Sequence, residues 1–196
     1  MKILSLLVVA LTLCIIGTSA QSKYNNTTMD EMNMAVYPQD TTAAAVILLK
    51  DATLDFTLDD LYGFRYEYTV SVKMKILKTE GLDEANQKIF YIREKRGSEE
   101  VIKSLSGTTY NLENGKIVKT KLSKEHIFDS SQDDKNFLKK FTMPAAKVGS
   151  IIEYKYTLVS DFFYEMRSFT FQESIPIEYV SYRVTIPEWF NYNTNM

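Results

Sequence analysis

The single histidine, His126, lies beside two carboxylates that could contribute to a metal site. Glu125 precedes it, and Asp129 follows three residues later. Imidazole and carboxylate groups are ordinary zinc ligands, but a site normally needs three or four ligands that converge from several elements. One imidazole with two loop carboxylates is a weak pattern. We therefore predict a solvated loop end here, with no metal and no cofactor.

A second acidic group, Asp129, Asp133 and Asp134, could bind calcium. Its spacing lacks the alternating acids and the glycine of an EF-hand loop, so we interpret it as a solvated charge cluster. The chain also contains no Gly-x-Ser-x-Gly and no glycine-rich phosphate loop. Glycosidase chemistry needs two carboxylates across a cleft. With 25 acidic residues in the chain, some such pair is inevitable, so its presence in the sequence does not indicate a glycosidase. The sequence therefore predicts no catalytic residue in this chain.

Aromatic residues are the unusual feature of the composition, with 13 Tyr and 11 Phe. Most of them alternate into one face of a predicted strand, where aromatic side chains are favoured and fill cores. Phe162, Phe163 and Tyr164 instead form a consecutive run between two predicted strands, and Trp189 lies close to the C-terminus. Because aromatic residues are enriched at interfaces, we predict that these four contact a ligand or another domain.

Residues 1–20 have the pattern of a secretory signal peptide, with Lys2, an apolar core and small residues before Gln21. The apolar run is shorter than the roughly 20 residues of a spanning helix, and no second long run follows, so we predict an exported chain without a membrane span. The only cysteine, Cys14, falls inside this segment, which leaves the exported domain to be held by its core alone. With 23 basic and 25 acidic residues, the charge predicts no nucleic-acid partner.

The rest of the chain has a hydrophobic period of two. From Phe64 to Ile76 the apolar and polar residues alternate without a break, which predicts a long strand. Asn114-Gly115 predicts a tight hairpin, and residues 129–136 an exposed loop. The other predicted strands are Thr42–Leu49, Lys88–Arg93, Val101–Asn111, Gly115–Leu122, Phe137–Met143, Ser150–Ser160, Glu165–Gln172 and Glu178–Ile186. This set, without a long helix, predicts an all-β, antiparallel, immunoglobulin-like β-sandwich over residues 37–196, after a polar linker or helical lead-in at 21–36.

Several segments are distinctive when taken in order. They include YPQDTTAAAVILLKD from Tyr37, KMKILKTEG from Lys73 and TTYNLENGKIVKTKLSKEHIF from Thr108. The most specific pieces are Pro144 followed by GSIIEY from Gly149, and Ile175-Pro176 before the last strand. Together they resemble the DUF3857 family, a domain of unknown function common in exported proteins of Bacteroidetes and other Gram-negative bacteria. The resemblance extends from about Tyr37 to the C-terminus.

This resemblance implies a β-sandwich that precedes a transglutaminase-like domain with a papain-type Cys-His-Asp site. None of those catalytic residues has a matching position here, so we predict a non-enzymatic accessory domain whose sandwich is incomplete at its C-terminus. Its expected partner is a transglutaminase-like domain of the same or a neighbouring protein, in the periplasm or cell envelope. The alternative is a stand-alone carbohydrate- or peptide-binding module. The sequence leaves the oligomeric state open.

Overall fold

The computed structural model describes residues 23–61, 63–94, 97–188 and 190. The predicted signal peptide at 1–20 and Trp189 lie outside these residues. The described chain has one short α-helix, α1 (Met29–Asn33), and two 3₁₀ helices, η1 (Thr79–Ala85) and η2 (Lys124–His126). Its strands, in chain order, are β1 (Ala45–Asp59), β2 (Gly63–Ile76), β3 (Asn86–Ile92), β4 (Glu100–Glu113), β5 (Lys116–Lys121), β6 (Ile127–Ser131), β7 (Asn136–Thr142), β8 (Ile151–Ser160) and β9 (Val180–Thr185).

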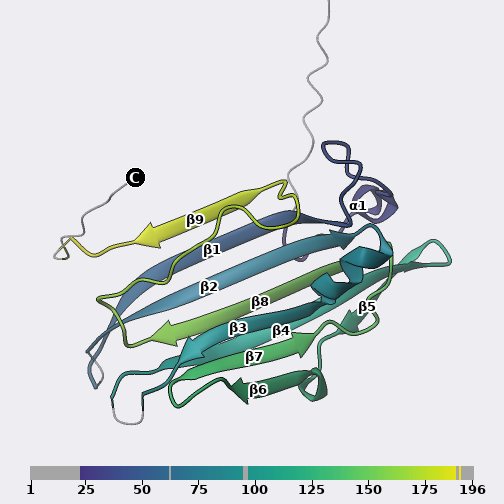
Figure 1. Cartoon of the computed structure of the whole chain (residues 1–196). Coiled ribbons are helices and arrows are strands. Elements are labelled where there is room, and N and C mark those ends of the chain that lie inside the picture. The colour runs from purple at the N-terminus through teal and green to yellow at the C-terminus, as the bar shows by residue number, and fades with distance from the viewer. Residues whose placement is uncertain (1–22, 62, 95–96, 189, 191–196) are drawn as a thin grey trace, which may run out of the picture.

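The strands form two sheets, which confirms the predicted all-β sandwich. The large sheet has the order β5-β4-β8-β2-β1-β9, and the small sheet has the order β3-β7-β6 and lies over the β4–β8 side of the large one (Figure 1). All strand pairs are antiparallel except β1 with β9. Strand β8 runs parallel to β1, and the connection after β8 brings the chain back to the end of the sheet where β8 began. Strand β9 therefore runs in the same direction as β8 and pairs with β1 in parallel.

Strand β2 shows how the alternation builds the main core. Tyr66, Tyr68 and Val70 each expose 5% or less of their surface and pack, on one face of the large sheet, with residues from the small sheet. The small sheet contributes Ile89 and Tyr91 from β3 and other residues from β7. This is the face that the alternation from Phe64 to Ile76 predicts as apolar, so the prediction is confirmed.

The predicted tight hairpin is also confirmed, and a second residue with left-handed backbone leads into β8. Asn114 and Gly115 join β4 to β5 with φ angles of 49° and 73°, the left-handed backbone that a two-residue hairpin of this type requires. Gly149, with φ of 87°, leads into β8, which lies between β4 and β2 at the centre of the large sheet. Glycine adopts such angles without the steric cost that a side chain brings.

The predicted strand Glu165–Gln172 is wrong. These residues belong to an irregular connection from β8 to β9, residues 161–179, which we call the strap. The alternation in this segment is real, but alternation does not supply the backbone partners that a strand needs. Residues 165–172 cross the face of the large sheet instead and are held there by side chains such as Arg167 and Phe169 (Figure 1).

The predicted loop at residues 129–136 is partly wrong. Strand β6 continues through Ser131 and pairs with β7, so only the residues after it form the turn. Asp133 organises that turn, since its carboxylate accepts hydrogen bonds from the backbone N–H groups of Lys135 and Asn136, both at 2.8 Å. Local bonding of this kind is common for aspartate in turns.

The other face of the large sheet is covered by residues 23–37, which we call the N-terminal segment. Within it, Thr28 and Glu31 form a capping box that starts helix α1. The segment packs on a second, smaller core that includes Val46, Leu48 and Ile151. Among the described residues, no helix is long and apolar enough to cross a membrane.

Candidate functional site

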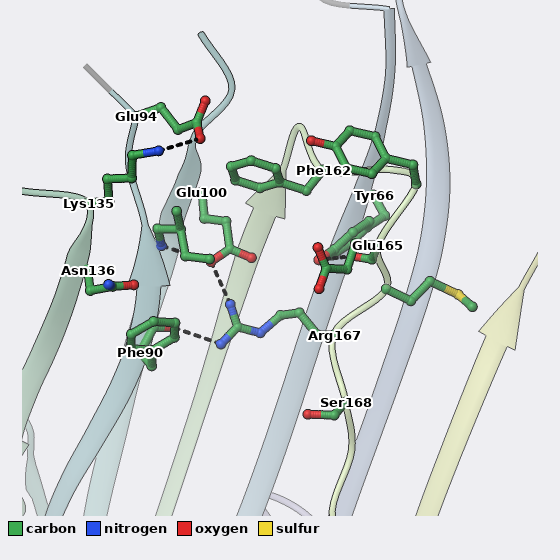
Figure 2. Close-up of a pocket in the computed structure, with 13 residues that line it drawn as sticks. Tyr66, Phe90, Glu94, Glu100, Lys135, Asn136, Phe162, Glu165, Arg167 and Ser168 are labelled. Atoms are coloured by element: carbon green, nitrogen blue, oxygen red, sulfur yellow. Dashed lines mark hydrogen bonds and ion pairs between the residues drawn. The ribbon is translucent and has the colours of Figure 1, made fainter. Parts of the chain in front are cut away.

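A cavity of about 560 Å³ opens where the strap passes the small sheet. Strand β2 supplies Tyr66 to its wall, β3 supplies Phe90 and Ile92, and the strap supplies Phe162 and the residues from Tyr164 to Ser168 (Figure 2). Glu100, at the start of β4, lies at the back. The cavity therefore joins both sheets and the strap, although these segments are distant in the sequence.

A buried ion pair fixes the inner end of this cavity. Arg167 Nη1 lies 2.7 Å from Glu100 Oε2, and both side chains are largely shielded from solvent. The second nitrogen, Nη2, donates to the Phe90 carbonyl at 2.7 Å, and the Ile92 N–H donates to Glu100 at 2.9 Å (Figure 2). Because each charge is neutralised and hydrogen-bonded, the pair holds the strap against β3 and gives the cavity a fixed shape.

The consecutive aromatic residues that the sequence predicts as contacts, Phe162–Tyr164, have two different environments in the structure. Phe162 and Tyr164 line the cavity, and the Tyr164 side chain is 65% exposed. Phe163 instead packs against Phe64 and Phe190, with ring centroids 5.9 and 6.2 Å apart. We call Phe162–Tyr164 the aromatic corner. Its middle residue anchors it to the sheet, and its outer two face the opening.

Tyr66 forms part of the cavity floor and keeps its proton. Burial raises the pKa of its phenol to about 12, so the hydroxyl remains a hydrogen-bond donor at neutral pH. It lies 3.5 Å from the Glu165 carbonyl of the strap. The cavity thus offers aromatic surfaces, a neutralised ion pair and a phenol. These groups suit the binding and orientation of a ligand.

The acidic residues weighed as metal ligands are placed apart from this cavity. His126 Nδ1 is 2.7 Å from the Ser123 hydroxyl and 4.0 Å from Glu125. Asp129 binds Lys139 at 2.7 Å and accepts from the Tyr91 hydroxyl at 3.1 Å. Within the described residues, no group of three or more His, Cys, Asp or Glu side chains is arranged to hold a metal ion.

Sequence reasoning missed Arg167, Glu100 and Tyr66. Arg167 falls in the segment wrongly predicted as a strand, and the alternation from Phe64 to Ile76 predicts Tyr66 only as a core residue. Glu100 follows another glutamate just before the predicted strand Val101–Asn111, a place where exposed acids are common. The only local signal was that the aromatic corner is followed closely by an arginine, and its partner on β4 is set by tertiary structure alone.

Fold and cavity together define an all-β sandwich domain with an aromatic-lined cavity bordered by its strap. The family described as a "Domain of Unknown Function with solved-structure structure", DUF3857, matches residues 64–196. The chain therefore belongs to the DUF3857 family, which confirms the resemblance of its sequence segments. No curated protein matches it. Among solved structures, it is similar to a crystal structure described as a "putative protease" from Parabacteroides distasonis, with 16% identity and a TM-score of 0.43 over 60% of this chain. The chain spans 23% of that protein's length.

Proposed function

We propose that this DUF3857 domain is a non-catalytic accessory domain of an exported protein, and that it packs on, or presents substrate to, a transglutaminase-like catalytic domain. The observation that carries the proposal is the aromatic corner. Phe163 is locked between Phe64 and Phe190, whereas the neighbouring Tyr164 is 65% exposed. A rigid base with exposed aromatic side chains is the usual form of an interface anchor.

The course of the chain supports this position for a partner. Strand β9 runs parallel to β1, and Phe190, which follows it, packs against Phe56 and Phe64 at the same end of the sheet as the corner. Leu58, paired with Phe64 across the β1–β2 hairpin, is 65% exposed. A catalytic domain joined after this point would begin beside an apolar surface already available to receive it.

The first test is to sequence the encoding DNA beyond the Met196 codon. A reading frame that continues into a Cys…His…Asp region agrees with the proposal. The two domains can then be produced as separate chains, and their affinity measured by isothermal titration calorimetry. The double variant Phe162→Ala/Tyr164→Ala should weaken association by about tenfold or more, as expected when interface anchors are lost.

Phe128→Ala provides a matched control, because Phe128 is also a large exposed aromatic residue, 62% exposed, but lies on β6. This variant should associate like the unmodified domain. A stop codon with no transglutaminase-like gene nearby, or equal affinity of the corner variant and the control, would overturn the proposal.

A stand-alone binding module is the second candidate, and the cavity itself favours it. Phe162 and Tyr164 border about 560 Å³ of space next to the Arg167–Glu100 pair, a combination that suits a carbohydrate or a peptide. The isolated chain should then bind such a ligand without any second domain. Glycan and peptide arrays, probed with the unmodified chain and with Tyr164→Ala, test this directly.

A further inference from the structure

Strand β3 has a free edge that faces the strap. It is the terminal strand of the small sheet, and its only partner there is β7. The bonds from Met143 N–H to Ala85 and from Arg93 N–H to Lys135 show that odd-numbered residues of this segment bond toward β7. The even-numbered residues therefore direct their N–H and C=O groups away from β7.

Both ends of that edge are capped, and its middle is open. At one end the Asn86 N–H donates to Asp83. At the other, Arg167 donates to the Phe90 carbonyl, and the Ile92 N–H donates to Glu100. Between the caps, in the described structure, the N–H and C=O of Lys88 and the N–H of Phe90 have no protein partner. Open groups of this kind on a strand edge are a template for pairing with another chain.

A groove runs along this open stretch. Beyond the first cavity lie two further cavities of about 250 and 120 Å³, both bounded by the strap and by β3, which supplies Gln87, Lys88 and Ile89 to the second and only Gln87 to the third. The first and second cavities share Ser168, and the second and third share Gln87 and Glu173. From Tyr66 to Met74, strand β2 forms the floor, a length of about 26 Å at the usual rise per residue.

The floor also offers unused polar groups. Tyr68 and Tyr156 line the second cavity, and neither hydroxyl has a hydrogen-bond partner in the described part of the chain. The opposite wall is held in place, since Phe169 stacks on Tyr182 at 4.7 Å and Lys50 donates to the Thr170 carbonyl at 2.7 Å. The groove is therefore preformed, with open backbone groups on one wall and hydroxyls beneath.

We propose that this groove binds an extended polypeptide segment of a partner protein, which adds as a strand to the open edge of β3 at Lys88. The inference rests on the proposed function, because a domain that presents a polypeptide substrate needs a place to hold it. One residue of the bound segment would lie opposite Lys88 and exchange both backbone hydrogen bonds with it. The caps at Asn86 and Phe90 limit the added strand to about five residues.

A peptide fits these observations better than a sugar. The unpaired groups of the edge alternate donor and acceptor at the spacing of a β-ladder, and another backbone in extended form matches that spacing along its length. The Tyr68 and Tyr156 hydroxyls can bond to the side chains or carbonyls that point down from such a strand. A sugar hydroxyl could also accept from the N–H of Lys88, but a sugar lacks the regular alternation of N–H and C=O groups that matches the rest of the edge.

The test starts from a phage-displayed library of random dodecapeptides, selected against the unmodified chain. An enriched peptide, labelled with fluorescein, gives a dissociation constant by anisotropy. Lys88→Pro removes the outward N–H without removing a bond to β7, and should weaken binding by about tenfold. Ser131→Pro makes the same change on β6, at the opposite edge of the same sheet, and should bind like the unmodified chain.

Two further measurements keep the inference testable if the Lys88→Pro variant does not fold. The double variant Tyr68→Phe/Tyr156→Phe removes only the two hydroxyls and should also weaken peptide binding. In the unmodified chain, the bound peptide should slow hydrogen exchange at the Lys88 and Phe90 amides. No enriched peptide, binding of glycans alone on an array, or unchanged exchange at these amides would overturn the inference.

The two proposals can fail separately. Lys88→Pro should leave association with the transglutaminase-like domain unchanged, because Lys88 lies outside the aromatic corner. The corner variant should weaken that association even where no peptide binds. A domain pair that associates through the corner, with no peptide bound in the groove, therefore rejects strand addition and keeps the accessory role.

Discussion

The two faces of the large sheet are both covered, but by contacts of different kinds. Under the N-terminal segment, Lys73, Lys75 and Glu153 have no exposed surface, yet each is bonded to a partner. Under the strap, Tyr68 and Tyr156 bury their rings but leave their hydroxyls open to a cavity. The first face is a closed polar network, and the second is an apolar floor with unused polar groups.

The closed face depends on its charges being satisfied together. Lys73 Nζ lies 2.7 Å from Glu31 and 3.8 Å from Glu153, and Tyr110 donates to Glu153 at 2.8 Å. Lys75 Nζ donates to the carbonyls of Met32 and Gly149, both at 2.6 Å. A buried network of this kind is stable only when every member is paired, so the N-terminal segment is a structural part of the domain.

The face under the strap is covered less completely. The end of the strap bonds through its backbone to β1, from Pro176 to Tyr179, but before that point it is held by a few side chains, among them Arg167 and Phe169. Cavities remain between those points, so a loop that crosses a sheet with little strand pairing can leave binding space above an otherwise ordinary core. We expect stability to depend mainly on the closed face, and binding to depend mainly on the open one.

The largest expected effect comes from breaking the closed network. Lys73→Met leaves Glu31 and Glu153 without their cation, and should lower the free energy of unfolding by about 3–5 kcal/mol. Urea denaturation at neutral pH measures it. Lys103→Met is the matched control, because Lys103 pairs with Glu67 at 2.8 Å on the surface, where such a pair is worth about 1 kcal/mol or less. Equal losses in the two variants would mean that the network is open to water.

The next effect is a dependence on pH. Burial lowers the pKa of Lys75 from 10.5 to about 8, partly opposed by the charge of Glu31. Between these values the unfolded chain binds a proton that the folded chain does not, so raising the pH stabilises the fold by up to about 3 kcal/mol in all. Lys75→Met should lose this rise.

The measurement is the difference in unfolding free energy between unmodified chain and Lys75→Met at pH 7.5, 8.5 and 9.5. Tyrosines with raised pKa values oppose the trend at higher pH, but they are common to both proteins and cancel in the difference. Parallel curves for the two proteins would contradict a lowered pKa of Lys75.

Much of the fold could be predicted because its signals are local. The alternation from Phe64 to Ile76 shows which side chains share a face, and Asn114-Gly115 fixes a hairpin through backbone conformation. Neither signal says what covers a face. Lys73 and Lys75 have the pattern of a polar, outward-facing row, and only the tertiary position of the N-terminal segment buries them. A hydrophobic period of two shows which side chains share a face of the sheet, but not which segment packs on that face.

The candidate site shows the same limit. Phe162 and Tyr164 could be predicted as contacts because an aromatic run between strands is unusual in itself. Phe163 belongs to the same run but packs inward, against a ring on β2. Arg167 and Glu100 are separated by 67 residues, and no spacing in the sequence relates them. Their pairing follows from the path of the strap, which the false strand prediction at Glu165–Gln172 concealed.

The smallest expected effect sharpens the comparison most, because one chemical change is made on each face. Tyr110→Phe removes a hydroxyl that donates to the buried carboxylate of Glu153 at 2.8 Å, and should cost about 1.5–3 kcal/mol of unfolding free energy. Tyr68→Phe removes a hydroxyl without a partner in the described structure, and should change stability by less than about 0.5 kcal/mol. Burial raises the pKa of both phenols, so both are protonated at neutral pH and the two losses are directly comparable. Urea denaturation of both variants measures them. Similar losses would mean that the Tyr68 hydroxyl is bonded in solution and that the open face is closed like the other.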